Sequence, residues 1–275
     1  MIVFKCWRRT LRTLALLEKQ FQTARTERLD PMLGWPPRAP HLTPVAQALA
    51  AAYHADADRL GEPAYHDRHH VSEAVEAMII LTDAALEASQ LSRELANLGI
   101  LAMLGHDLGH DGSLASPGHL EAIAVSRVTD LAQTLTPVEQ DVLRQIILAT
   151  APDRVPANLA RARTPQATPL DLLAALANEA DVLASLLPEL GCVLTHLLAE
   201  EWQPHDAERA AQTLLFSSRG DFLSIYAEPT LAARSLGLDE CIRRQREAIT
   251  PELDTMPRDR AMARYRARLA GWASG

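Results

Sequence analysis

Aromatic residues, glycine and cysteine are all scarce in this chain of 275 residues. Aromatics make up 4% of it, and there are 12 glycines and three cysteines. Cys6, Cys192 and Cys241 lie far apart and form no C-x-x-C motif, so they predict neither a disulfide framework nor a thiolate metal site. Scattered thiols of this kind are typical of a reducing compartment, and we therefore expect a cytoplasmic protein.

Long apolar runs and an excess of positive charge are also missing. No apolar run reaches the roughly 20 residues that a membrane-spanning helix requires. The formal net charge of -8 argues against binding along nucleic-acid backbones, because neutralising phosphates requires a basic surface. The arginine-rich C-terminal segment RDRAMARYRARLAG has no wider basic face around it, so we interpret it as a solvent-exposed helix face. A small-molecule substrate is the better expectation, and the sequence leaves open whether the chain forms a homo-oligomer.

Apolar residues recur at helical spacing along most of the chain, and alternating strand patterns are hard to find. These patterns predict an all-α fold. Two proline-bearing stretches interrupt the helical periodicity, at residues 34–44 and 151–169. We expect residues 1–45 to form an N-terminal helix and a proline-rich linker, and residues 46–275 to form the functional body of a single domain. The second stretch is expected to be a loop within that body.

Ionisable side chains gather in two short segments of this apolar chain, AYHDRHHV at residues 64–71 and LGHDLGHDG at residues 104–112. Residues 95–107 are apolar on all faces until His106 and Asp107, so they predict a buried helix that carries two polar side chains into the interior. Residues 170–187 do the same with Asp181. Buried imidazoles and carboxylates are costly unless they are paired or bound to a metal, so these side chains require compensation.

A divalent cation would compensate them. His70, the adjacent His106 and Asp107, and Asp181 supply two imidazoles and two carboxylates, a set suited to Zn, Mn, Fe or Mg. The second oxygen of Asp107 could bridge to another ion, and two metal ions a few Å apart are typical of phosphoester hydrolysis. That reaction also requires a general acid near the leaving oxygen, and His66 could supply it.

The order of these residues resembles that of the HD-domain metal-dependent phosphohydrolases. More narrowly, YHDRHHVSE is similar to the Y-H-N-x-x-H-x-x-D signature of the class I cyclic nucleotide phosphodiesterases, whose fold is a compact helical bundle. The resemblance implies that His66 is the general acid, that two divalent ions are bound, and that the substrate is a 3′,5′-cyclic nucleotide cleaved to the 5′-monophosphate. It also implies a role for each matching position: metal ligands at His70, His106, Asp107 and Asp181, and support of the second metal through water by His110 and Glu121.

The resemblance extends to a substrate pocket, in which it implies three contacts. Tyr65 is the tyrosine of the signature, and Phe222, seven residues before Pro229, matches the aromatic that clamps the base. Arg219 stands where the family has a purine-binding glutamine, and it can donate hydrogen bonds but cannot accept them. It could read the acceptor edge of guanine or bind an additional phosphate. The signature's asparagine and aspartate are replaced here by Asp67 and Glu73.

Three alternatives remain open on the sequence. The same metal site could hydrolyse another nucleotide, such as a nucleoside monophosphate or a cyclic dinucleotide. An HD-fold di-iron oxygenase would need further histidine ligands around a second iron. A domain of the same fold could also bind a nucleotide without turnover, although the intact ligand set argues against that interpretation.

Overall fold

The computed structural model describes residues 11–27 and 39–270, and within these residues the chain is all α-helical, as the sequence predicts. No β-strand occurs among them. The α-helices are α1 (Leu11–Thr26), α2 (Thr43–Leu60), α3 (Arg68–Glu87), α4 (Arg93–Gly105), α5 (His119–Leu131), α6 (Pro137–Ala149), α7 (Val155–Ala162), α8 (Pro169–Leu186), α9 (Pro188–Trp202), α10 (Ala207–Thr213), α11 (Phe216–Ile225), α12 (Leu231–Ser235), α13 (Leu238–Ala248) and α14 (Arg258–Arg268). Two short 3-10 helices, η1 (Pro40–Leu42) and η2 (Pro251–Thr255), complete the described elements.

Helices α3, α4 and α8 form the centre of the protein, and α3 packs against both of the others. Every residue of α4 from Ala96 to Gly105 is buried, which explains why its sequence is apolar on all faces. Helix α8 is buried from Ala175 to Ala180 in the same way. These two helices occupy the ranges that the sequence predicts for buried helices that carry polar side chains inward.

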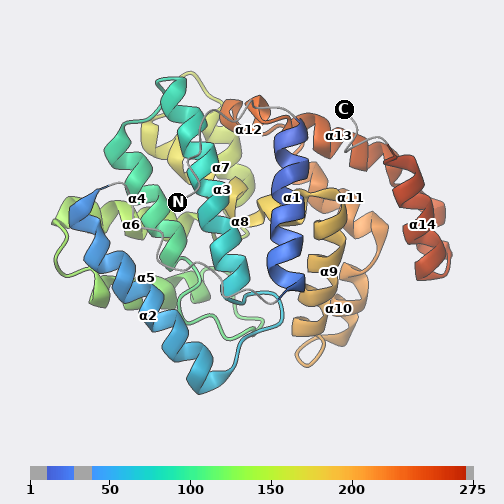
Figure 1. The fold of residues 1–275 in the computed structure, drawn as a ribbon, viewed down its shortest axis with the longest axis horizontal. Helices are drawn as coiled ribbons and strands as arrows, with labels where there is room; N and C mark the ends of the chain where they lie inside the picture. Colours follow the sequence, from blue (N-terminus) through green and yellow to red (C-terminus); the bar gives the residue numbers. More distant parts are fainter. Residues whose placement is uncertain (1–10, 28–38, 271–275) are drawn as a thin grey trace.

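Helix α1 packs into this same core, although the sequence predicts that a linker separates it from the body. Its Leu14, Leu17 and Phe21 are 0 to 3% exposed and belong to the main hydrophobic cluster. In Figure 1, α1 stands between α3 and α9 and contacts both. Residues 1–10 and 28–38 of the predicted N-terminal helix and linker lie outside the described residues.

The prediction of a loop over residues 151–169 is wrong in its central part, because α7 lies within it. Pro156 occupies the first turn of α7, and Pro169 begins α8. A proline in the first turn costs little, because the N–H that it lacks would have had no intrahelical partner there. The prolines of this stretch therefore mark where helices begin.

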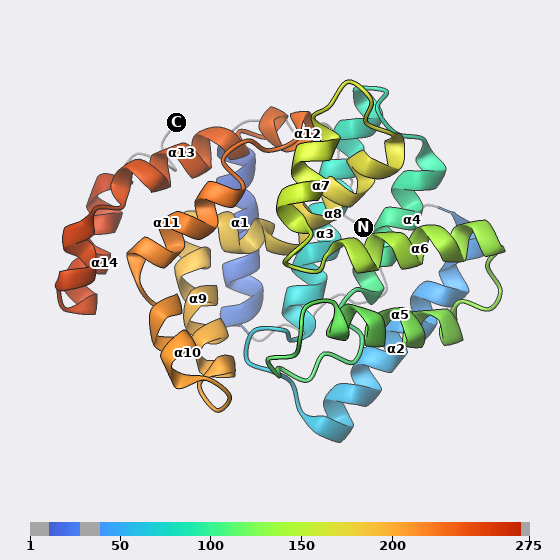
Figure 2. The ribbon, with the colours of Figure 1, turned by 180° about the vertical axis from the view of Figure 1, so that it is seen from behind.

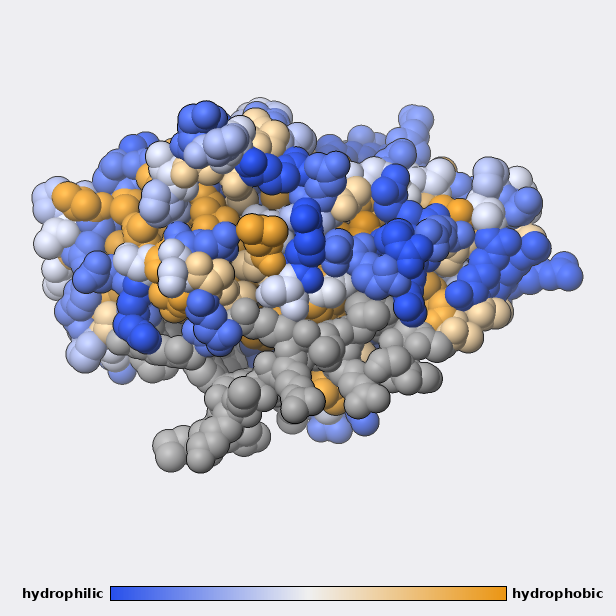
Figure 3. All heavy atoms as spheres, turned by 90° about the horizontal axis from the view of Figure 1, so that it is seen from above, coloured by the Kyte–Doolittle hydropathy of each residue, from blue (hydrophilic) through white to orange (hydrophobic). Residues whose placement is uncertain are grey.

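The remaining helices surround α3, α4 and α8. From behind, α2 and α5 lie together at the opposite end from α14 (Figure 2). Hydrophilic residues gather around α14 in the view from above (Figure 3), in agreement with the expected solvent-exposed arginine face. No single described helix is both long and apolar enough to cross a membrane. Only α8 and α9 taken together have the length and composition, and this pair is bent by 95°.

Gly99 sets how closely α4 approaches its neighbours. A Cβ atom at this position would stand 2.6 Å from Met78 Cε and 2.7 Å from Leu173 Cδ1, and both side chains are 0% exposed. We therefore expect Gly99→Ala to lower the free energy of unfolding by about 1 to 3 kcal/mol, because a filled core must deform around the added methyl group.

Gly220 in α11 provides the matched control, because an added Cβ would meet only ordinary contacts at 3.7 Å and beyond. Gly220→Ala should raise the free energy of unfolding by about 0.5 to 1 kcal/mol through helix propensity. Urea unfolding of both variants measures the difference. Equal stability in the two variants would contradict the close approach at Gly99.

Candidate metal centre and its acid pair

The four predicted metal ligands meet at one point between α3, α4 and α8. His70 lies in the first turn of α3, Asp181 lies in α8, and His106 caps the C-terminus of α4 just before Asp107. The Nε2 atom of His70 is 3.1 Å from Asp107 Oδ2 and 3.1 Å from Asp181 Oδ1. The Nε2 atom of His106 is 3.3 Å and 3.2 Å from the same two oxygens.

His70, His106 and Asp181 each offer a donor atom close enough to the other two to hold one cation, and Asp107 Oδ2 lies 3.1 Å and 3.3 Å from the two imidazole nitrogens. Ligands at about 2.0 to 2.2 Å from a metal ion stand about 3.0 to 3.5 Å apart when they are tetrahedral or adjacent in an octahedron. Two of the four donor atoms, His70 Nε2 and Asp107 Oδ2, are buried and have no hydrogen-bond partner among the described residues. A cation bound between the four atoms would satisfy both.

The hydrogen bond at the other ring nitrogen of His106 favours the ligating tautomer. The Nδ1 atom of His106 lies 2.7 Å from the carbonyl oxygen of Met103, which can only accept a hydrogen bond. The proton therefore sits on Nδ1, and Nε2 directs a lone pair toward the two carboxylates. In the neutral form this is a repulsive contact between acceptors, which either protonation of the ring or a bound cation would relieve.

The charges of the four groups are strongly linked when no metal is bound. Burial lowers the pKa of both histidines, but this effect is outweighed chiefly by Tyr65 at His70 and by Asp107 at His106, so both pKa values lie above the usual value. Burial likewise raises the pKa of both aspartates, and the charge of His106 is the largest of the effects that lower them again, to well below the usual range. The site thus holds ionised carboxylates, which a divalent cation requires.

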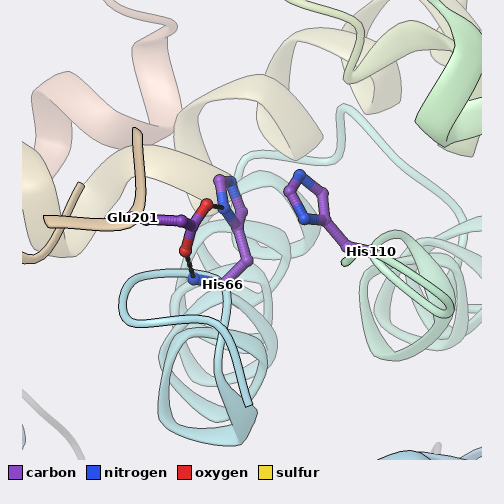
Figure 4. A group of neighbouring side chains, drawn as sticks. All are labelled: His66, His110 and Glu201. Atoms are coloured by element: carbon purple, nitrogen blue, oxygen red, sulfur yellow. Dashed lines mark hydrogen bonds and ion pairs between the residues drawn. The ribbon is translucent and has the colours of Figure 1, made fainter. Parts of the chain in front are cut away.

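His66 lies beside this centre and forms an ion pair with Glu201 of α9. Its Nδ1 atom is 2.6 Å from Glu201 Oε1, while Oε2 accepts the backbone N–H groups of Tyr65 at 2.8 Å and His66 at 3.0 Å (Figure 4). Burial alone would raise the pKa of Glu201, but the hydrogen bond and charge of His66 outweigh it and lower that pKa. The ionised carboxylate thus orients the ring and leaves Nε2 as the reactive nitrogen.

Glu201 is a site residue that the sequence analysis missed. It is only 7% exposed although a glutamate next to it, Glu200, is exposed. A signal for it exists, because Glu201 follows Leu190, Leu194 and Leu197 at helical spacing and therefore falls on the apolar face of α9. A carboxylate on the buried face of a helix requires a partner inside the protein.

His110 stands alongside His66, with the two rings stacked at a centroid distance of 3.8 Å and an interplanar angle of 20° (Figure 4). Its Nδ1 atom accepts the backbone N–H of Gly112 at 3.0 Å, so the neutral ring carries its proton on Nε2. Burial, followed by the charge of His66, lowers the pKa of His110 to about 4. His110 is therefore neutral at neutral pH.

His66, His110 and Glu201 are also close enough to be considered as ligands of a further metal ion. The stacking of the two rings argues against that use. An imidazole binds a metal ion that lies in the plane of its ring, and two planes stacked 3.8 Å apart at only 20° do not meet near the rings. This arrangement is better suited to orienting a proton donor than to sharing one cation.

Tyr65 and Glu121 also lie near the centre, as the sequence predicts. The Tyr65 ring centroid is 5.0 Å from that of His70, and its hydroxyl group is 2.9 Å from Ser185 Oγ in α8. Burial raises the pKa of Glu121, and the charges of Asp107 and Asp181 raise it further. Glu121 lies in the first turn of α5, and its pKa shows that the charges of Asp107 and Asp181 act on it.

Arg219 does not have the free guanidinium that a substrate contact requires. It is 6% exposed, and its terminal nitrogens donate to the carbonyl oxygens of Ser185 and Leu187 and to Gln245 Oε1. It thereby ties α11 to the end of α8 and to α13. We therefore leave Arg219 out of the proposed substrate contacts and correct the expectation accordingly.

Phe222 is half-buried in α11 and packs against the main hydrophobic cluster. Its ring lies 5.5 Å from that of Tyr226. Burial raises the pKa of Tyr226 well above its usual value, and the charge of Asp181 raises it further. The contacts of Phe222 are thus with Tyr226 and the hydrophobic cluster.

No model of a known protein family matches this chain, and no curated protein matches it either.

The low pKa of His110 predicts a specific dependence of stability on pH. Between about pH 6.5 and pH 4 the unfolded chain binds a proton at this residue and the folded chain does not, so stability falls as the pH falls. We expect His110→Phe, which keeps an aromatic ring beside His66, to remove about 2 to 3 kcal/mol of this decline. Urea unfolding at pH 7, 5.5 and 4 measures it. His205→Phe, a change at an exposed histidine, is the control, and an identical decline in the two variants would contradict the prediction.

Proposed function

We propose that this protein is a metal-dependent phosphodiesterase that hydrolyses a 3′,5′-cyclic nucleotide to the 5′-monophosphate. The observation that carries the proposal is the group of His70, His106 and Asp181, whose donor atoms lie close enough together for one divalent cation, with Asp107 Oδ2 3.1 Å from His70 Nε2. The His66–Glu201 pair beside it supplies the proton donor that ester cleavage requires. The resemblance of the surrounding motifs to cyclic nucleotide phosphodiesterases supports the choice of substrate.

The bound divalent ions would supply an activated hydroxide and neutralise the charge that develops on phosphorus. His70, His106, Asp107 and Asp181 would hold the first of them, and the location of Glu121 suits it to support a second through water. Within the chain, Glu201 holds the His66 ring by Nδ1, so that its Nε2 atom can donate a proton to the departing ribose oxygen. The neutral ring of His110 covers one face of His66 and limits the access of water to it.

The di-iron oxygenase alternative receives less support from the geometry. A second iron would need histidine ligands beyond the first four residues, and His66 and His110 are the nearest candidates. Their stacked rings and the hydrogen bond of His66 to Glu201 suit acid chemistry better, as argued above. We therefore propose hydrolysis.

The proposal is tested by incubating the protein with Mn²⁺ or Mg²⁺ and a panel of cyclic AMP, cyclic GMP, cyclic dinucleotides and nucleoside monophosphates. We expect conversion of a cyclic mononucleotide to its 5′-monophosphate, and chromatography measures this product. Asp181→Asn should lower kcat at least about 1,000-fold and remove the tightly bound metal, because it replaces an anionic ligand by a neutral one. If only the other nucleotides are hydrolysed, the substrate is a different phosphoester from the one proposed. If no compound of the panel is hydrolysed, the proposal is wrong.

A second experiment isolates the role of His66 as the acid. His66→Ala should lower kcat for the cyclic nucleotide about 100- to 10,000-fold, because its alkoxide leaving group needs a proton. It should lower kcat for bis(p-nitrophenyl) phosphate much less, because p-nitrophenolate leaves without one. Glu201→Gln should shift both values in the same sense as His66→Ala but by less, whereas the adjacent exposed Glu200→Gln should leave both unchanged. Equal losses on both substrates would contradict the assignment of His66.

A further inference from the structure

Two carboxylates flank the metal-binding turn of α3, at the two positions where the sequence departs from the family signature. Asp67 caps the N-terminus of α3, and its Oδ1 atom accepts the backbone N–H of His70 at 2.8 Å. Glu73 lies three residues after His70, and its side chain is 5% exposed. The side chain of Asp67 is 17% exposed and that of Glu73 is buried, and two carboxylates this far removed from water require a positive partner.

Arg25 of α1 is that partner, and it bridges the two carboxylates. Its Nε and Nη2 atoms donate to the two oxygens of Glu73 at 2.6 Å and 3.0 Å. Its Nη1 and Nη2 atoms donate to the two oxygens of Asp67 at 3.2 Å and 3.4 Å. The Arg25 side chain is 11% exposed, so water screens these contacts little. The planar guanidinium reaches both carboxylates at once, which the single ammonium group of a lysine cannot do in the same geometry.

The same segment of α3 is held on its other side by α9. Glu201 accepts the backbone N–H groups of Tyr65 and His66, just before the cap at Asp67. Helix α9 is tied to α1 in turn, because Glu18 accepts the backbone N–H groups of Glu189 and Leu190 at 2.7 Å and 2.9 Å. In Figure 1, α1 stands between α3 and α9, where it can hold both. Residues 65–73, which contain the proposed acid and one ligand, are therefore fixed from two helices.

We propose that Arg25 is a positioning residue for the metal centre, which fixes the location of His70 by holding the Asp67 cap and Glu73. The inference rests on the metal site of the proposed function. His70 lies in the first turn of α3, where backbone N–H groups have no intrahelical partner and a helix frays most easily. A ligand on such a turn binds metal tightly only when groups around it hold the turn in place. Arg25 provides that restraint from a helix that contributes no ligand.

The test is a titration of the metal-free protein with Co²⁺, followed by the visible absorption of the bound ion, together with thermal unfolding. Arg25→Ala should weaken the affinity for Co²⁺ about 10- to 100-fold, in the range seen when groups that orient metal ligands are removed. Arg25→Lys keeps the charge and should remain folded, with an intermediate loss. Adding Asp67→Asn to Arg25→Ala should restore part of the affinity, because the amide still caps α3 and leaves no unpaired charge there.

Gln20→Ala is the matched control, because Gln20 also ties α1 to α3, through a hydrogen bond of 2.7 Å to Glu76 beyond the metal-binding turn. It should leave the Co²⁺ affinity unchanged. Wild-type affinity in both Arg25 variants, or an equal loss in Gln20→Ala, would overturn the positioning role while leaving the metal site intact. Absence of a Co²⁺ spectrum in the wild-type protein would instead overturn the metal site, and this inference with it.

Discussion

Two imidazoles and two carboxylates face each other at 3.1 to 3.3 Å in the interior of an otherwise apolar bundle, and this concentration of charge is the constraint on which the rest of the structure depends. The two imidazoles are buried and the side chains of Asp107 and Asp181 are only 16% and 22% exposed, so water solvates the four groups only in part. The ion pairs of His70 and His106 with the two aspartates offset the charge in part, but His70 Nε2 and Asp107 Oδ2 make no hydrogen bond among the described residues. A divalent cation would satisfy both atoms, and the proposed chemistry rests on it.

Three histidines around this centre are given different roles by what contacts their Nδ1 atoms. At His106 the partner is the carbonyl of Met103, which places the lone pair of Nε2 on the metal side. The partner of His66 is the carboxylate of Glu201, which orients the ring and suits it to carry and donate a proton. At His110 the partner is the N–H of Gly112, which makes Nδ1 an acceptor, and burial keeps the ring neutral. The proposed roles of ligand, acid and neutral cover thus come from one residue type, because a different group contacts the Nδ1 atom of each ring.

The parts of this arrangement that were predictable from the sequence are those with a local pattern. The buried helices around His106 and Asp181 follow from apolar periodicity that ends in, or is interrupted by, a polar residue. The pairing of His66 with Glu201 joins residues 135 positions apart, and that of Arg25 with Glu73 joins residues 48 apart, so neither has a local pattern. Arg219 shows the opposite error. Its position in a motif predicts a substrate contact, but its guanidinium donates instead to the carbonyl oxygens of Ser185 and Leu187 and to Gln245. Helix α7 was missed because prolines at helix starts were interpreted as breaks.

Asp67 and Glu73 are the two positions that differ from the phosphodiesterase signature, and both of them contact Arg25, which lies outside the signature. An asparagine at the cap of α3 would accept the same hydrogen bond from the His70 backbone without bringing a charge into the interior. Asp67 at this position, with the buried Glu73 six residues later, requires a positive charge that reaches both carboxylates. Arg25 supplies that charge. The two acidic residues and the arginine therefore form one unit, and a change in any one of them alters what the others cost. If His70 is a metal ligand as proposed, α1 is part of the structure that holds its turn, because Arg25 supplies the positive charge that Asp67 and Glu73 share.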